Sequence, residues 1–144
     1  MSGRTFLDSN VLVYSVDESP VEKAKHERAV ELLSVQPENL VVSTQVLQEF
    51  YVVTTRKLRN PLSKERAARA VRGIAKLDVV GIDAPLVLAA VDTSRTAQIS
   101  LWDALIVEAA SRAGCEQVLS EDLNASQVIR GVRIENPFTG HMRP

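Results

Sequence analysis

The chain has 144 residues, of which 45% are hydrophobic and 24% charged, and its formal net charge is −1. This length predicts a single domain over residues 1–144, and the ordinary composition argues against a disordered or low-complexity protein. Apolar runs too short to cross a membrane, the absence of a signal-peptide pattern and a lone Cys115 indicate a cytoplasmic protein with no membrane partner.

Short β-branched runs alternate with longer helical patterns along the whole chain. Strands are expected at residues 4–7, 40–42, 79–82, 117–120 and 132–134. Helices are expected over 20–35, from 43 or 44 to before Asn60-Pro61, from Ser63 to about 77, from 83–85 onward, and from 100 to 114. This alternation predicts an α/β fold with three α/β/α layers and a short-stranded, mainly parallel central sheet, followed by an irregular end over 136–144.

Polar residues follow two of the expected strands at the point where each strand ends. Asp8 directly follows the first strand, and Asn10 stands at the start of the next helical turn. Ser120, Glu121 and Asp122 directly follow the fourth strand. In a parallel α/β sheet, functional sites form beyond the carboxyl ends of the strands. Both clusters are therefore predicted to lie on the same edge of the sheet.

Two further acids are unusual because each lies along an apolar helix face. Glu49 shares its expected face with Val46 and Val53, and Asp103 is followed at i+3 by Ile106. A surface acid normally shares its face with other polar groups. We therefore expect both carboxylates to point toward the interior, where an unpaired charge is costly.

Each acid also has a purely structural interpretation. Asp103 could complete a capping box with Ser100, and Glu49 could extend its carboxylate to solvent. Asp8 could cap the following helix, and residues 121–122 could form an acidic turn.

Four such acids are better explained together than separately. Clustered carboxylates repel one another and need a cation to stay ionised in one place, and oxygen ligands favour Mg²⁺ or Mn²⁺. Such a cation activates water and neutralises charge on a phosphodiester, which is the chemistry of a metal-dependent nuclease without a protein nucleophile.

These residues stand in segments that resemble the motifs of one family. Residues 6–12, Phe6-Leu7-Asp8-Ser9-Asn10-Val11-Leu12, resemble the opening motif of the PIN-domain ribonucleases. The segments 48–50, 101–106 and 119–123 resemble the second, third and fourth acidic motifs of that family. Order and spacing match across essentially the whole chain, and the size is most similar to VapC-type toxins of bacterial toxin–antitoxin pairs.

The resemblance implies an acidic catalytic pocket built from Asp8, Glu49, Asp103 and Asp122. It implies that Asp8 and Asp103 bind the Mg²⁺ or Mn²⁺ ion directly. Asn10 would orient Asp8, and Ser120 would hydrogen-bond the metal waters or a neighbouring carboxylate. Glu121 could replace or assist the adjacent fourth acid.

The same resemblance implies an endoribonuclease that cleaves single-stranded RNA with activated water and leaves a 5′-phosphate and a 3′-hydroxyl. Its expected partners are the RNA substrate, a cognate antitoxin of a type II pair, and a second copy of the chain in a homodimer. Two alternatives stay open. One is a haloacid-dehalogenase-like phosphatase with Asp8 as nucleophile, Lys76 binding phosphate and residues 121–122 binding metal. The other is an inactive PIN-like interaction module.

Basic residues gather in one segment, because residues 56–76 hold eight bases and the single acid Glu65. This segment predicts either an RNA contact through Arg66, Arg69 and Arg72 or a docking face for the antitoxin or second subunit, and the plain alternative is a solvated helix face.

Aromatic side chains that could stack on RNA bases are few. Those near the motif segments are Tyr14, Phe50, Tyr51 and Trp102. Any one of them could hold an unpaired base, but each is expected to belong to the core.

Overall fold

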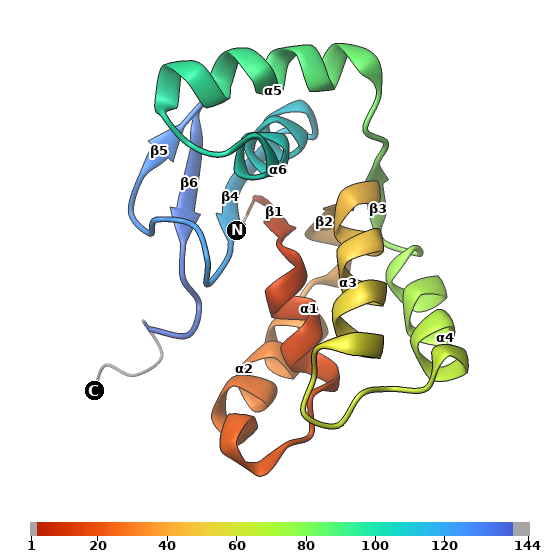
Figure 1. Ribbon diagram of the computed structural model, residues 1–144. Coiled ribbons are helices and arrows are strands. Elements are labelled where there is room, and N and C mark those ends of the chain that lie inside the picture. The colour runs from red at the N-terminus through yellow and green to blue at the C-terminus, as the bar shows by residue number, and fades with distance from the viewer. Residues whose placement is uncertain (1–2, 140–144) are drawn as a thin grey trace.

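A six-stranded sheet forms the centre of the molecule (Figure 1). In the computed structural model, which describes residues 3–139, the strands are β1 Arg4–Leu7, β2 Leu40–Ser43, β3 Asp78–Val80, β4 Cys115–Leu119, β5 Val128–Ile129 and β6 Val132–Glu135. Their spatial order is β3-β2-β1-β4-β6-β5, and every neighbouring pair is parallel except β5 and β6. This confirms the predicted α/β class with a short-stranded, mainly parallel sheet.

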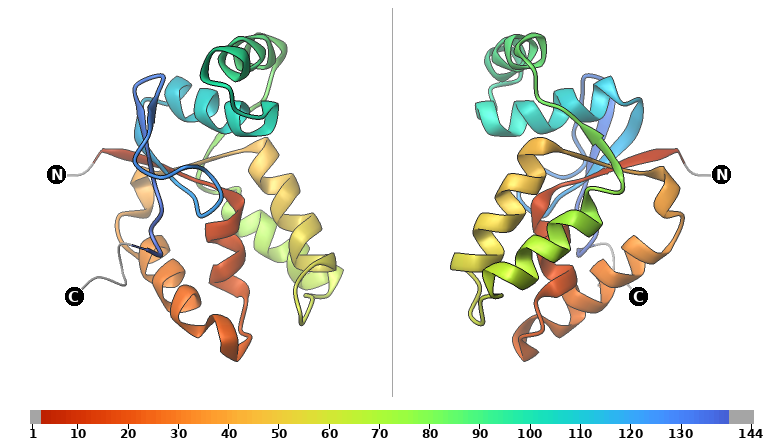
Figure 2. Two further views of the ribbon diagram at one scale, coloured as in Figure 1. Left: turned by 60° about the vertical axis from the view of Figure 1, so that its left-hand side comes forward. Right: turned by 90° about the vertical axis from the view of Figure 1, so that its right-hand side faces the viewer.

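Helices cover both faces of the sheet. The α-helices of the described residues are α1 Ser9–Val16, α2 Lys23–Ser34, α3 Thr44–Arg56, α4 Lys64–Ile74, α5 Ala84–Ala97 and α6 Leu101–Arg112. Helices α5 and α6 lie on one side of the sheet and α1 to α4 on the other, which gives the three expected layers (Figure 2). Within residues 3–139, no helix has the length and apolar character needed to span a membrane.

Four of the predicted helix starts have a side chain that caps the first turn. Ser43, Ser63, Asp83 and Ser100 each accept a hydrogen bond from a backbone N–H in the first turn of α3, α4, α5 and α6 respectively. These hydrogen bonds satisfy amide groups that have no partner inside the helix. Short polar side chains therefore mark the starts of these four helices in both sequence and structure.

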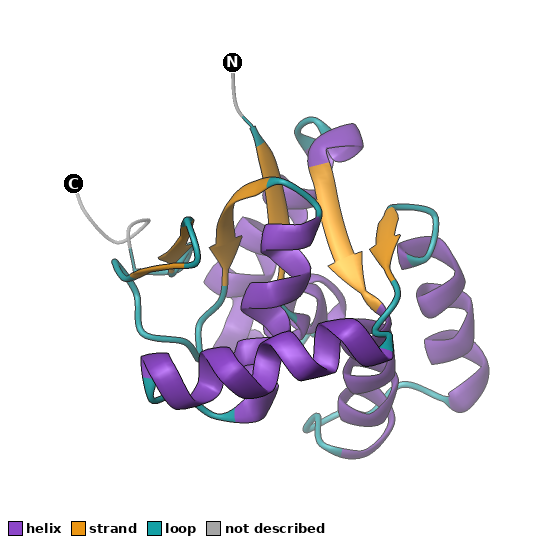
Figure 3. Cartoon of the chain, turned by 90° about the horizontal axis from the view of Figure 1, so that it is seen from above, coloured by secondary structure: helices purple, strands orange, loops and turns teal. Residues whose placement is uncertain are grey.

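The structure departs from the expected elements in several places. Helix α1, Ser9–Val16, was expected only as a helical turn at Asn10. The helix expected over 20–35 begins as a 3-10 turn, Pro20–Glu22, and becomes α-helical only at Lys23. Strand β5 was not expected; it forms an antiparallel hairpin with β6 at the edge of the sheet (Figure 3). Arg130 and Gly131 connect the two strands with positive φ angles of 54° and 77°, as a two-residue hairpin turn requires. Of the expected irregular end, residues 136–139 form a turn and 140–144 lie outside the described residues.

The core lies on both sides of the central strands. Phe6 and Leu7 of β1 and Val41 and Val42 of β2 are fully buried, which explains why these strands read as unbroken apolar runs. Helix α6 is buried from residue 104 to residue 110 and packs between the sheet and α5. Its first turn, by contrast, leaves the core at the carboxyl edge of the sheet and carries the third acidic motif.

Candidate active site

Asp8 and Ser120 lie side by side where β1 and β4 end. The two strands are parallel neighbours with Leu7 opposite Leu119, so the next residue of each strand reaches the same level. Ser120 Oγ donates a hydrogen bond to Asp8 Oδ2 at 2.7 Å. The backbone N–H of Ser9 donates to Asp8 Oδ1 at 2.7 Å, so Asp8 also caps α1. The capping interpretation is therefore confirmed for Asp8, and its role in a functional site stays a prediction.

Asn10 joins the start of α1 to the loop after β4. Its Nδ2 donates to Asp122 Oδ2 at 3.2 Å and lies 3.4 Å from Asp8 Oδ2, while its Oδ1 accepts from the backbone N–H of Glu121 at 3.1 Å. Ser120 Oγ accepts from the backbone N–H of Asp122 at 3.1 Å. Asn10 and Ser120 are therefore hydrogen-bonded to both the first and the fourth acid or its backbone, and the roles that the resemblance implies for them stay predictions.

Glu49 reaches the same place from α3. Its carboxylate accepts hydrogen bonds from Ser9 Oγ at 3.2 Å and from Gln45 Nε2 at 3.3 Å. Gln45 Nε2 also donates to the backbone carbonyl of Trp102 at 3.3 Å, so this buried amide ties α3 to the first turn of α6. The oxygen of the same amide, Gln45 Oε1, is buried and has no hydrogen-bond partner in the part of the chain that the structure describes.

Asp103 completes the group from the first turn of α6. Ser100 Oγ accepts from the backbone N–H of Asp103 at 3.0 Å, which is the N-cap half of the predicted capping box. The carboxylate of Asp103 lines the cavity that the other acids share.

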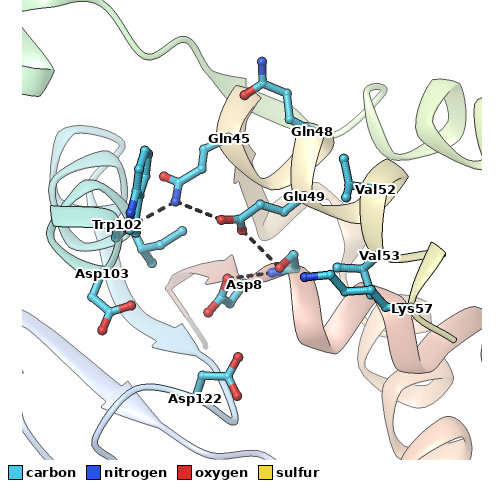
Figure 4. A pocket seen from close by; sticks show the side chains of 12 residues that line it. Asp8, Gln45, Gln48, Glu49, Val52, Val53, Lys57, Trp102, Asp103 and Asp122 are labelled. Atoms are coloured by element: carbon cyan, nitrogen blue, oxygen red, sulfur yellow. Dashed lines mark hydrogen bonds between the residues drawn. The ribbon is translucent and has the colours of Figure 1, made fainter. Parts of the chain in front are cut away.

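All four predicted acids line a single cavity of about 420 Å³. Its lining is Asp8, Ser9, Gln45, Gln48, Glu49, Val52, Val53, Lys57, Trp102, Asp103, Ile106 and Asp122. In Figure 4 the four carboxylates face a common space, although they come from four separate elements of the chain. A cavity of this size is large enough for a small ligand such as a nucleotide.

The crowding of these acids shows in their pKa values. Burial raises the pKa of Asp8 to about 6, and repulsion from Glu49 and Asp122 adds to the rise, against hydrogen bonds from Ser120 and Ser9. Burial also raises the pKa of Asp103, and the charge of Asp122 contributes. Asp122 thus repels both expected metal ligands, and a cation in the cavity would offset this repulsion.

The donor set fits a hard divalent cation. Every acidic ligand offers carboxylate oxygen, which Mg²⁺ and Mn²⁺ prefer. Within residues 3–139, no three His, Cys, Asp or Glu side chains are grouped closely enough to hold a metal ion by themselves. Mg²⁺ commonly binds through one or two carboxylates and keeps several waters, so a pair such as Asp8 and Asp103 suits it.

Glu121 points away from the acidic cavity. Tyr14 OH donates to Glu121 Oε1 at 2.7 Å, and Lys25 forms an ion pair with the same carboxylate. Burial and the hydrogen bond to Glu121 raise the pKa of Tyr14 to about 12, while the bond to Glu121 raises the pKa of Lys25. Glu121 does not line the cavity whereas its neighbour Asp122 does, so the geometry favours Asp122 as the fourth acid.

Replacing Asp122 should lower the cleavage rate, whereas replacing the adjacent Glu121 should leave it nearly unchanged. If this cavity cleaves RNA around a bound cation, Asp122→Asn should lower the cleavage rate by roughly 10- to 100-fold, because it removes one of the acids that would surround the cation. Glu121→Gln should leave the rate within about threefold, since its carboxylate bonds to Tyr14 and Lys25 instead. Initial rates on one labelled RNA would decide this, and equal losses in the two variants would contradict the assignment.

Sequence reasoning did not single out Lys57, which lines the cavity at the end of α3. Figure 4 shows its side chain extending toward Asp8 and Glu49, and it forms no ion pair with any other described residue. The spacing could have indicated Lys57 in the sequence, because it follows Glu49 by eight residues and so lies on the same face of the helix. Gln45 was missed too, although it precedes Glu49 by one turn.

The predicted RNA-contact arginines lie elsewhere. Arg66, Arg69 and Arg72 are exposed on α4, which packs against α3, and none of them lines the acidic cavity. Lys76 is exposed in the turn after α4 and is likewise absent from the cavity lining. The structure therefore does not assemble the site that the haloacid-dehalogenase-like alternative requires around Asp8.

Comparison with known families agrees with this geometry. The family model of the PIN domain matches residues 5–130. The chain belongs to the PIN domain family. No curated protein sequence matches this PIN domain.

Solved structures share its fold at low sequence identity. The VapC20 toxin of Mycobacterium tuberculosis, which cleaves the sarcin-ricin loop, is 21% identical with a TM-score of 0.65 over 82% of this chain and 91% of that one. A toxin–antitoxin complex from Klebsiella pneumoniae is 16% identical with a TM-score of 0.68 over 93% and 98% of the two chains. The DNA-bound VapBC of Salmonella typhimurium is 20% identical with a TM-score of 0.66 over 94% and 98%.

Proposed function

We propose that this PIN domain is a metal-dependent endoribonuclease that cleaves single-stranded RNA, and that it is the toxin of a type II toxin–antitoxin pair acting in the cytoplasm. The observation that carries the proposal is the convergence of four carboxylates from separate elements on one cavity of a PIN domain. Oxygen ligands around a cavity of nucleotide size suit a cation that meets phosphate.

Asp8 and Asp103 are the residues that would hold Mg²⁺ or Mn²⁺. When bound, such an ion lowers the pKa of a water molecule and neutralises charge that develops on the phosphodiester. Asn10 and Ser120 keep Asp8 in place by hydrogen bonds to its carboxylate or its neighbours. This arrangement fixes the cation site before substrate arrives, so little reorganisation is needed at the moment of reaction.

Two further side chains would accept the proton of the attacking water and bind the phosphate of the RNA. Glu49 is held by Ser9 and Gln45 and can accept a proton from the attacking water. Lys57 brings a positive charge to the cavity, where it can pair with a phosphate oxygen. Water attacks phosphorus, the bond from phosphorus to the 3′ oxygen breaks, and the 3′ oxygen takes a proton. The products are a 3′-hydroxyl and a 5′-phosphate.

The proposed protein partners rest on similar structures and on one surface. The similar proteins include toxin–antitoxin complexes. Between α3 and α4 runs a largely apolar groove of about 530 Å³, lined by Leu47, Gln48, Tyr51, Val52, Ala68, Val71 and Arg72. An exposed apolar surface of this kind suits a protein partner, which we propose to be the antitoxin. A homodimer is proposed as well, and the mass of the isolated chain in solution tests it.

The activity is tested by incubating the purified chain with single-stranded and double-stranded RNA of one sequence. Cleavage of the single strand with Mg²⁺ or Mn²⁺, its loss in EDTA, and 5′-phosphate ends on the products are the expected results. Products with a 2′,3′-cyclic phosphate would contradict the mechanism. Metal binding without any cleavage would favour the inactive interaction module.

The α4 arginines give a separate prediction about RNA binding. If they bind phosphates, changing Arg66, Arg69 and Arg72 to Glu should weaken RNA binding and lower the slope of log K against log salt by about 0.7 for each phosphate that is no longer neutralised. Filter binding at several salt concentrations measures the slope, and solution mass is measured in parallel. An unchanged slope together with a disrupted dimer or antitoxin complex would assign this face to a protein partner.

A further inference from the structure

Trp102 is the single tryptophan of the chain and is unusually exposed for its size. It is 64% exposed, and it is the only aromatic residue among the large exposed hydrophobic side chains of the described residues. It also lines the acidic cavity. The expectation that it belongs to the core is therefore wrong, whereas Phe50, another aromatic residue near a motif, is fully buried.

The backbone at Trp102 is held in place by neighbouring residues of α3 and of the start of α6. Its backbone carbonyl accepts the hydrogen bond from Gln45 Nε2 at 3.3 Å, and it stands in a helix turn capped by Ser100. Figure 4 shows the ring beside Gln45, whose buried Oε1 has no partner within residues 3–139. Indole surface left in water and an acceptor left without a donor are both unfavourable. A ligand that covers the ring would offset the first of these costs.

The neighbours of Trp102 narrow the chemistry of that ligand. Asp103, an expected metal ligand, is the next residue in the chain. Ile106, one helical turn further on, and Val53 give the same cavity apolar wall, and Lys57 gives it a positive charge. A flat aromatic group attached to an anionic phosphate matches this combination of exposed ring, apolar wall and positive charge. The largely apolar groove between α3 and α4 is better suited to a peptide.

We propose that Trp102 is a stacking platform for a nucleobase, namely the base of a nucleotide next to the scissile phosphate. This inference rests on the proposed function, since it assumes RNA in the acidic cavity. Stacking on an aromatic ring tolerates any base because every base has a π-face. The platform therefore selects unpaired nucleotides over paired ones and holds the phosphate of a bound strand beside the carboxylates.

The single tryptophan makes the platform directly observable. The Asp8→Asn variant, in which cleavage is expected to be lost, is titrated in Mg²⁺ buffer with a single-stranded decamer and with an abasic decamer of equal charge. The base-containing decamer should quench the Trp102 fluorescence and the abasic one should not.

Matched variants then measure the affinity. By anisotropy of a labelled decamer, Trp102→Ala should weaken binding by roughly 5- to 100-fold, and Trp102→Phe should stay within about threefold because it keeps an aromatic face. Leu88→Ala removes a side chain that is 68% exposed on α5, outside the cavity, and should bind like the parent.

Equal affinity of Trp102→Ala and its parent, or equal quenching by the abasic decamer, would overturn the platform. If Trp102→Ala with Asp8 intact also cleaves RNA at the wild-type rate, only the platform fails and the proposed nuclease function stands. If the wild type neither binds nor cleaves single-stranded RNA, the proposed function fails with it. Unchanged RNA affinity combined with lost self-association would assign Trp102 to a protein interface.

Discussion

Asp8→Asn is expected to lower the rate of RNA cleavage by roughly 100- to 1000-fold while making the metal-free protein more stable. The rate falls because a neutral amide is a poor ligand for a divalent cation. Stability rises because Asp8 is only 6% exposed and its carboxylate is repelled by Glu49 and Asp122. The hydrogen bond from the backbone of Ser9 can persist, since Asn also offers an oxygen there.

The gain in stability should appear in a defined pH window. The pKa of Asp8 is about 6 in the folded protein, against an ordinary value of 3.8, so between these values the folded state binds more protons than the unfolded state. The free energy of unfolding therefore falls as pH rises through this range, by about 3 kcal/mol for this one group. The Asp8→Asn variant has no carboxylate to ionise at this position, so this pH-dependent fall in the free energy of unfolding is absent from the variant.

Urea denaturation in EDTA at about pH 4 and at about pH 7.5 measures the effect. The two proteins should be nearly equal in stability at the lower pH, and the variant should be more stable at the higher pH. Asp92→Asn, a change at an exposed acid of α5 outside the cavity, should show no such difference. A variant less stable than the wild type at pH 7.5 would mean that the charged Asp8 stabilises the fold as the cap of α1.

Mg²⁺ or Mn²⁺ is expected to raise the melting temperature of the wild type by roughly 5–10 °C at a hundredfold excess over Kd. An ion that binds only the folded state stabilises it by about 2.7 kcal/mol at that excess, and a domain of this size gains roughly 2–4 °C for each kcal/mol. Asp8→Asn combined with Asp103→Asn should abolish the shift, because both expected ligands are lost. Differential scanning fluorimetry measures it.

The controls for the melting experiment separate the cavity from other acids. Asp92→Asn should melt with the same metal-dependent shift as the wild type. A full shift in the double variant would place the cation elsewhere on the protein, and no shift in the wild type at saturating Mn²⁺ would contradict the metal site.

Much of this site could be predicted from the sequence, because the parallel direction of the strands determines which residues meet at one edge of the sheet. Asp8 and Ser120 each follow a short apolar strand, and parallel neighbours bring such positions to one edge. Glu49 and Asp103 were found because each lies on an apolar helix face, where an unpaired charge is costly and therefore suggests a functional role. That signal is not sufficient alone, since Glu108 lies on the buried face of α6 and instead pairs with Thr93 and Arg130.

The remaining features depend on tertiary geometry. Glu121 and Asp122 are adjacent in a turn, and only the folded loop shows which of them faces the cavity and which meets Tyr14. The bridge from Gln45 to Trp102 joins residues 57 positions apart in the chain. Strand β5 has two residues, too few for an alternating pattern to be recognised.

The central claim is that the acidic cavity is where this PIN domain cleaves RNA, and Asp103→Asn tests it most directly. A labelled single-stranded RNA is incubated with an excess of either protein in Mg²⁺, and the melting temperature of each protein is measured alongside. The prediction is that the variant melts no lower than the wild type and binds the RNA, yet loses cleavage by at least about 100-fold. Cleavage by the folded variant at the wild-type rate would contradict the claim and place the activity outside the cavity.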